Sequence, residues 1–211
     1  MSLVVGSYGL QIFQVSQSKE WAEKWTTSEV YEIEARAPGD AIPTVAQVRQ
    51  MMQTLLADRF QLKVSRGNQV MPVYNLVVAP GGPKLQPSAF AGSEPLTKDE
   101  GTTGLHRRLR CLNLSMADLV EAVRRQFDRP LLDKTGLTGG FDFSLDYVWQ
   151  PPFGTSADAV AAVEASAGPP DLQGGLPIAA SLQKELGLRV VPAREQAEIL
   201  VIEHAERPSA N

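Results

Sequence analysis

Two acidic residues in the second half of the chain are of a type, and at a spacing, that could serve acid–base catalysis. Asp133 and Asp142 flank a glycine-rich segment, T-G-L-T-G-G at 135–140. Two carboxyl groups about 5–10 Å apart around a pocket can act as acid and base in glycoside hydrolysis. Glu32 or Glu34 would complete such a set in a cleft between two halves of the chain. A hydrolase or carbohydrate-acting enzyme is therefore the alternative function.

The glycine-rich segment has a second interpretation as a loop that cradles phosphate. Such loops usually lead from a strand into a helix, whereas this one leads into a predicted strand at 141–147. A turn between two strands is therefore favoured. Asp133, Asp142 and Asp146 lack the spacing of a calcium loop. We expect no metal and no cofactor, and retain as possible binding residues Asp133, Thr135, Gly136 and Asp142.

The other residues that bind metals or attack substrates are scarce. Neither His106 nor His204 has a second histidine or a carboxylate at metal-binding spacing, so both are expected to be ordinary surface residues. Cys111 is the only cysteine, which excludes an intrachain disulfide and a cysteine-rich zinc site. Apolar neighbours predict that Cys111 is a buried, unreactive thiol. No catalytic residue is assigned.

Two tryptophans form the remaining candidate binding site. Trp21 and Trp25 are four residues apart, so they share one face of a short predicted helix. Packing in the core is one interpretation. An exposed aromatic platform for a sugar or a peptide is the other. The sequence leaves both open.

Composition restricts the class of protein. Among 211 residues, 43% are hydrophobic and 21% charged, as in soluble globular proteins. The net charge of −4 provides no basic surplus for nucleic acid, which we exclude as a partner. No stretch reaches the ~20 apolar residues of a membrane span. Residues 1–3 resemble an added leader, and we expect native sequence upstream, including a membrane anchor.

Local signals predict the elements that would position these residues. Helices are expected at 44–60, 115–127 and 177–186. Thr44 with Gln47 would begin the first helix, and Ser115 with Asp118 the second. The third would begin at Pro177 and end at Gly187. Alternating residues predict strands. The predicted strands are 31–37, 62–65, 73–79, 109–114, 141–147, 188–191 and 198–203. Turns are expected at 66–68 and 193–196, and long loops at 80–104 and 149–177.

The order of these elements repeats. A strand, a helix and two further strands occur at 31–79 and again at 141–203. The sequence predicts an α+β fold of two pseudo-duplicated units, each a small, mostly antiparallel sheet with helices on one face. The first unit is residues 1–87, truncated at its N-terminus. A linker at 88–104 precedes the second unit, 105–211, which carries a flexible insertion near 150–176.

Several motifs together resemble a known family. They are W-T-T-S-E-V-Y-E-I-E-A at 25–35, M-Q-T-L-L-A-D-R-F-Q-L at 52–62, D-K-T-G-L-T-G-G-F-D-F at 133–143, and the closing blocks at 182–188 and 201–208. The chain resembles the soil-associated, acidobacterial family of unknown function DUF3738. That resemblance implies a location outside the cytoplasm and names no activity. The family often has a histidine where this chain has Ser65, so a catalytic role for that histidine does not carry over.

A weaker resemblance concerns the second unit alone. Residues 112–147 with 177–203 are similar in element order to the short N-terminal domain of secretins and TonB-dependent receptors, which implies binding to a partner protein. We therefore expect a non-enzymatic interaction module of the cell envelope. Strand addition at Glu198–Glu203 is the expected mode if that strand is an open sheet edge.

Overall fold

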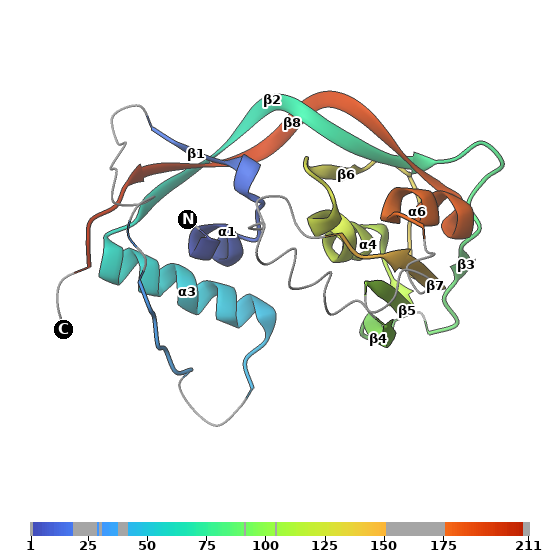
Figure 1. The fold of residues 1–211 in the computed structure, drawn as a ribbon, viewed down its shortest axis with the longest axis horizontal. Coiled ribbons are helices and arrows are strands. Elements are labelled where there is room, and N and C mark those ends of the chain that lie inside the picture. Colours follow the sequence, from blue (N-terminus) through green and yellow to red (C-terminus); the bar gives the residue numbers. More distant parts are fainter. Residues whose placement is uncertain are drawn as a thin grey trace. The chain divides into compact units, whose positions relative to one another are not determined.

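The computed structural model describes residues 2–18, 29, 31–37, 42–90, 92–103, 105–150 and 176–208. It has the predicted α+β fold, with two four-stranded sheets among the described residues. Figure 1 shows the arrangement of the elements. None of the described helices is both long and apolar enough to cross a membrane.

The first sheet has the strand order β1-β8-β2-β6, with β1 parallel to β8 and β2 parallel to β6. The second sheet has the order β3-β7-β5-β4 with antiparallel neighbours. The strands are β1 (Val15–Gln17), β2 (Lys63–Val78), β3 (Gln86–Pro87), β4 (Leu96–Thr103), β5 (His106–Leu114), β6 (Leu131–Asp133), β7 (Phe141–Val148) and β8 (Leu188–His204).

The helices begin and end at the residues whose side chains favour those positions. Thr44 caps α3 and Ser115 caps α4, each in a reciprocal pair with the third helical residue, as predicted. Gly187 ends α6 with φ of 67°, also as predicted. The helices are α1 (Ser2–Tyr8), η1 (Ile12–Gln14), α3 (Val45–Phe60), α4 (Met116–Val123), η2 (Arg124–Gln126) and α6 (Ile178–Leu186).

Two predicted turns are wrong. Residues 66–68 continue the single strand β2, and 193–196 continue the single strand β8. The two strands are neighbours in the first sheet and run side by side in Figure 1. Because each strand supplies hydrogen-bond partners to the other, their polar stretches stay extended instead of turning back. Arg66 and Glu198 form an ion pair of 2.5 Å there.

Two other segments differ from prediction. Residues 31–37 form no strand, although their side chains alternate. The expected loop at 80–104 contains β4, which pairs with β5. Alternation is a weak signal for a strand that has no partner, and a polar segment can pair where a neighbouring strand holds it. Most of the insertion near 150–176, including the alanine-rich stretch at 157–167, lies outside the described residues.

Contacts group the chain into two compact units. Unit 1 combines 1–71 with 195–211, and unit 2 is the continuous segment 72–194. The sequence predicts consecutive units, 1–87 and 105–211; in the contact-based grouping, β2 and β8 contribute to both units and segment 88–104 lies in unit 2. Descent of the matched segments from a duplication stays a prediction.

Each unit has its own core. In unit 1, α1 packs on α3, and the buried cluster includes Val4, Leu56 and Leu200. In unit 2, α4 and α6 cover one face of the second sheet. That core is larger and includes Leu76, Cys111, Leu114, Met116, Leu119, Val123, Leu145, Leu182, Leu186 and Leu188. Helices on one face of a small sheet are the predicted arrangement for this unit.

The first sheet also corrects the expected binding edge. Strand β8 lies between β1 and β2, and Leu200, Val201 and Ile202 pair with β1. Glu198–Glu203 is therefore not an open edge, and strand addition at that segment is wrong.

Candidate functional site

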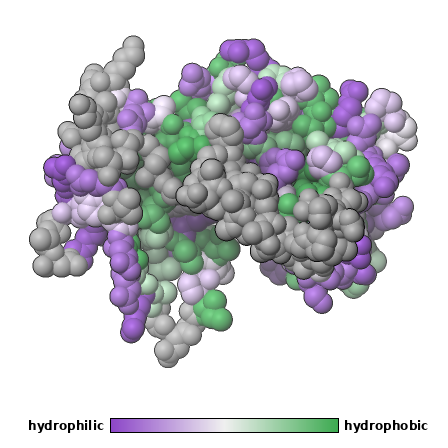
Figure 2. Space-filling view, viewed as in Figure 1, coloured by the Kyte–Doolittle hydropathy of each residue, from purple (hydrophilic) through white to green (hydrophobic). Residues whose placement is uncertain are grey.

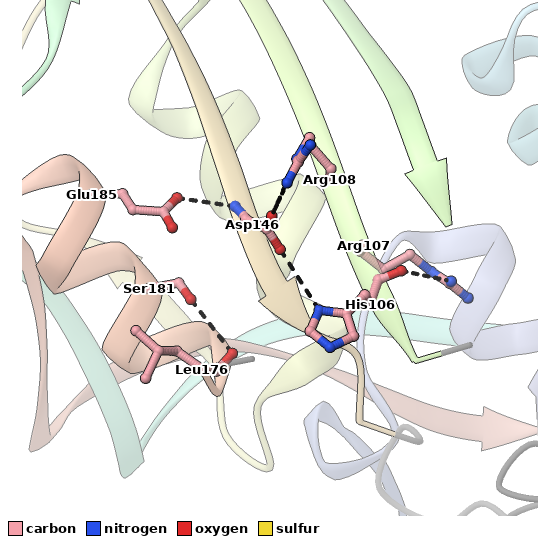
Figure 3. Close-up of polar contacts among 7 residues, drawn as sticks. All are labelled: His106, Arg107, Arg108, Asp146, Leu176, Ser181 and Glu185. Atoms are coloured by element: carbon pink, nitrogen blue, oxygen red, sulfur yellow. Dashed lines mark hydrogen bonds and ion pairs between the residues drawn. The ribbon is translucent and has the colours of Figure 1, made fainter. Parts of the chain in front are cut away.

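A polar cluster joins β5, β7 and α6 in unit 2 (Figure 3). Antiparallel pairing places Arg108 opposite Asp146, while Leu109 lies opposite Leu145 one residue further along. Successive side chains point to opposite faces of a sheet. Arg108 and Asp146 therefore lie on the face away from the core, where the two strands bring opposite charges together.

Asp146 is the centre of this cluster. Its Oδ2 accepts hydrogen bonds from Arg108 Nη2 at 2.7 Å and from Arg108 Nε at 3.1 Å. Its Oδ1 lies 3.9 Å from His106 Nδ1. The bond from Arg108 to Asp146 raises the pKa of the Arg108 guanidinium. The cluster is thus a paired-charge contact that ties β5 to β7.

Helix α6 closes the outer edge of β7. Past its short pairing with β3, β7 has no further strand neighbour on that side in the described part. The Asp146 N–H donates instead to Glu185 Oε2 at 2.9 Å, and the Val148 N–H donates to the Leu176 carbonyl at 2.9 Å. The Glu185 carboxylate therefore supplies a hydrogen-bond acceptor at a position where a neighbouring strand would otherwise supply one.

The nearby hydroxyl and second guanidinium also have structural partners. Ser181 is fully buried, and its Oγ donates to the Leu176 carbonyl at 3.4 Å. Arg107 lies over the Trp149 ring, 5.8 Å from its centroid. A nucleophilic serine must present its oxygen to substrate, and Ser181 does not.

The structure brings together Asp133, Thr135 and Gly136 within one turn. Asp133 Oδ1 accepts from the Thr135 N–H at 2.9 Å and from Thr135 Oγ1 at 2.7 Å. The Leu137 N–H donates to Thr135 Oγ1 at 3.1 Å, and Gly136 has φ of 69°. These are the local bonds of a turn between β6 and β7, the arrangement favoured from the sequence. Ligand binding by these residues stays a prediction.

Asp142 belongs to a separate set of hydrogen bonds. A bond from the Ser88 side chain, then bonds from the Asn113 and Ala89 backbone, lower the pKa of its carboxyl group. The Asn113 N–H to Asp142 Oδ1 distance is 2.9 Å. Asn113 has φ of 52°, at the register shift between β5 and β7. Asp142 thus holds this irregular end of β5.

Two acidic residues of unit 1 line a cavity within that unit. Glu32 and Glu34 line a cavity of about 270 Å³ together with Tyr31 and Phe60, whose rings meet edge to face at 5.6 Å. An enzyme that combines these residues with Asp133 and Asp142 stays a prediction. Trp21 and Trp25 lie outside the described residues.

The family of the chain is shown by comparison with known proteins. A family model described as "Protein of unknown function (DUF3738)" matches residues 2–205. The chain belongs to the DUF3738 family. No curated protein and no solved structure matches it.

The histidines and the cysteine of this DUF3738 chain have ordinary surroundings. His204 is half-buried and its Nε2 lies 2.9 Å from Glu206 Oε1. Cys111 is 1% exposed, and burial raises the pKa of its thiol to about 11. A thiol in that environment is protonated and unreactive at neutral pH. Within the described ranges, no three histidine, cysteine or acidic residues are placed to hold a metal.

Two surfaces of the DUF3738 chain were missed from the sequence. At the start of α3, the apolar residues Val45 and Val48 are 69% and 43% exposed. A cavity in unit 2 is lined by residues from five separate segments, among them Tyr74 and Phe127. Apolar residues close together at the start of the predicted helix were the available signal for the first surface. The second surface had none, because its residues are far apart in the sequence.

Proposed function

We propose that this DUF3738 chain is a non-enzymatic interaction module that works outside the cytoplasm, in the cell envelope, and binds a partner protein through the start of α3. The observation that carries the proposal is the run of exposed apolar residues there. Ile42, just before α3, is 95% exposed, and the exposed residues Val45 and Val48 lie in the first turn of the helix. Contiguous apolar surface is characteristic of sites that bind proteins.

The exposed residues border a groove suited to apolar side chains of a partner. A cavity of about 410 Å³ lies between the segment before α3 and the first turns of the helix. Figure 2 shows hydrophobic surface in this area. The lining residues are Ala37, Ile42, Pro43, Gln47, Gln50, Met51 and Thr54. Among the described residues that line the cavity none is charged, so a partner inserting apolar side chains against them would leave no charge of theirs buried and unpaired.

The fold holds this surface in place. The Thr44 cap fixes where α3 begins, with the Gln47 N–H donating to Thr44 Oγ1 at 3.3 Å. Three turns further along the helix, Leu56 is buried with Val4 and Leu10. Gln53 Nε2 also donates to the Ser7 carbonyl of α1 at 2.8 Å. A surface fixed in this way binds without a large cost of ordering.

Site-directed crosslinking in the source cells tests this proposal. A photo-crosslinking amino acid at Val48 is expected to yield a discrete adduct in the envelope fraction. The same amino acid at Asp58, an exposed position later in α3, is the matched control and should yield none. A Val45→Glu substitution should abolish the Val48 adduct because it places a charge in the apolar contact.

Each component of the proposal has its own contrary outcome. Recovery of the protein in the cytoplasmic fraction would overturn the location. Equal adducts from Val48 and Asp58, or a Val48 adduct that persists in Val45→Glu, would overturn the binding surface.

A further inference from the structure

A cavity of about 470 Å³ in unit 2 has the size and lining of a small-ligand site. Its lining residues come from β2, from η2 and the two residues after it, from Gln150 after β7, from the start of α6 and from β8. The apolar lining residues are Tyr74, Phe127, Pro177, Ile178, Ala179 and Val190. We propose that this cavity binds a small amphipathic anion, an apolar body about the size of an aromatic ring system ended by one carboxylate, with Arg125 as the partner of that carboxylate.

The apolar body would meet an aromatic surface. The Tyr74 and Phe127 rings lie 5.7 Å apart between centroids and are tilted by 55°. Phe127 is only 8% exposed, so it is anchored in the core. Arg129 lies over Tyr74 at 5.2 Å from the ring centroid. Tilted rings of this kind provide flat apolar faces against which an unsaturated or aromatic ligand packs.

The charges around the cavity leave one cation uncompensated. Asp128 lies 3.7 Å from Arg129 and hydrogen-bonds the Tyr74 phenol, so its carboxylate already has partners. Arg125 also lines the cavity, is exposed, and makes no ion pair with any described residue. A guanidinium fork binds one carboxylate through two parallel hydrogen bonds. The local charge therefore favours a ligand with a single carboxylate.

The floor of the cavity is formed before any ligand arrives. The Tyr74 N–H donates to the Pro130 carbonyl at 2.7 Å, and the Phe127 N–H donates to the Arg124 carbonyl at 3.1 Å. On the rim, the Gln150 N–H donates to Gln126 Oε1 at 2.9 Å. A preformed site loses little conformational entropy on binding. This site is in unit 2 and does not depend on the α3 surface of unit 1.

Titration calorimetry on the purified full chain tests the proposal. The probe is naphthalene-2-carboxylate, and naphthalene-2-methanol is its uncharged match. We expect the carboxylate to bind about 10-fold more tightly than the alcohol, because a hydrogen bond to a charged group contributes about 1.5 kcal/mol. Arg125→Gln should remove this difference and leave binding of the alcohol unchanged.

A second cation controls for general charge. Lys184 is exposed and lines a different cavity of unit 2, so Lys184→Gln should leave carboxylate binding unchanged. Ala179→Phe should abolish binding of both probes by filling the site, with an unchanged melting temperature showing that the variant is folded. Equal binding of the two probes, no saturable binding, or carboxylate affinity lost in Lys184→Gln but not in Arg125→Gln would each overturn the proposal.

The same chemistry has two natural sources, a small organic acid or the carboxyl terminus of a peptide. A short peptide ending in phenylalanine, with its terminus either free or amidated, separates them. If the peptide with the free carboxyl terminus binds and the amidated peptide does not, a peptide terminus is identified as a ligand. Binding of naphthalene-2-carboxylate with neither peptide would restrict the site to small acids.

Discussion

Gly187 and Gly82 meet backbone to backbone where α6 ends. Gly187 has the left-handed φ of 67°, and a Cβ on it would overlap the Gly82 carbonyl oxygen. Two hydrogen bonds hold this approach: Lys84 N–H to the Leu186 carbonyl at 2.9 Å and Ala79 N–H to the Gly187 carbonyl at 2.8 Å. The end of the helix is thus packed directly on the loop that follows β2.

Gly187→Ala is therefore expected to be strongly destabilising. Gly136→Ala is the matched control, since Gly136 has nearly the same φ, 69°, and open space where its Cβ would lie. Both variants incur the strain of a left-handed alanine, about 1–2 kcal/mol. In Gly187→Ala the free energy of unfolding should fall by about 1–3 kcal/mol more than in Gly136→Ala, because the loop after β2 must move to make room for the Cβ. Chemical denaturation measures the difference, and equal losses would contradict this contact.

Truncating the centre of the unit 2 core should also lower stability. Leu182 is fully buried on α6, so Leu182→Ala is expected to reduce the free energy of unfolding by about 2–5 kcal/mol. The adjacent Gln183 is exposed, and Gln183→Ala should change it by less than about 0.5 kcal/mol. Similar values for the two variants would show that α6 does not pack as described.

The single thiol reports on the same core. Because burial raises the pKa of Cys111 to about 11, the native protein should not react with an aromatic disulfide reagent at pH 8. One equivalent should react after denaturation. The unfolded thiol loses its proton near its ordinary pKa of 9.0, so this group's contribution to stability is full below pH 9 and declines as the pH rises towards 11. Rapid labelling of the native protein would contradict the burial.

Asp142 gives stability the opposite dependence on pH. Its hydrogen bonds from Ser88 and Asn113 lower the pKa of the folded carboxyl below the ordinary value of 3.8. Its contribution is therefore full above that value and is lost as the pH falls through the folded pKa. Asp142→Asn should flatten the acid limb of the stability curve. Asp58→Asn, at an exposed position on α3, is the control and should leave it unchanged.

A glycine in β2 distinguishes a strand from a turn. A Cβ on Gly67 would lie 3.7 Å from the Ile199 side chain, an ordinary contact. In a strand interior glycine is less stable than a residue with a side chain by about 0.5–1 kcal/mol. Gly67→Val should therefore raise the melting temperature. A large decrease would indicate that the chain turns at 66–68.

Features fixed by neighbouring residues were predictable from the sequence. These features depend on residues within about four positions of one another. They are the caps at Thr44 and Ser115, the helix end at Gly187 and the turn from Asp133 to Leu137. The turns predicted at 66–68 and 193–196 failed because distant pairing decides the conformation. Arg66 and its ion-pair partner Glu198 are 132 residues apart.

The candidate sites show the same division. Burial of Cys111 followed from its apolar neighbours. The exposure of Val45 and Val48 did not follow from the predicted helix at 44–60, because it depends on how far α1 covers α3. The cavity at Tyr74 and Phe127 combines residues more than 50 positions apart, so no local sequence pattern predicts it.

The division of the chain between its units has a consequence for its synthesis. Unit 2 is continuous, whereas the core of unit 1 needs Leu200 and Ile202 from the last strand beside Val4 and Leu56. On the ribosome, the N-terminal 71 residues must therefore wait, unfolded, while residues 72–194 emerge and fold. A chain that ends at residue 194 and is held on the ribosome by an added unstructured linker, long enough to bring residue 194 out of the exit tunnel, is expected to resist protease in its later segment and not in its first, an inversion of the usual order.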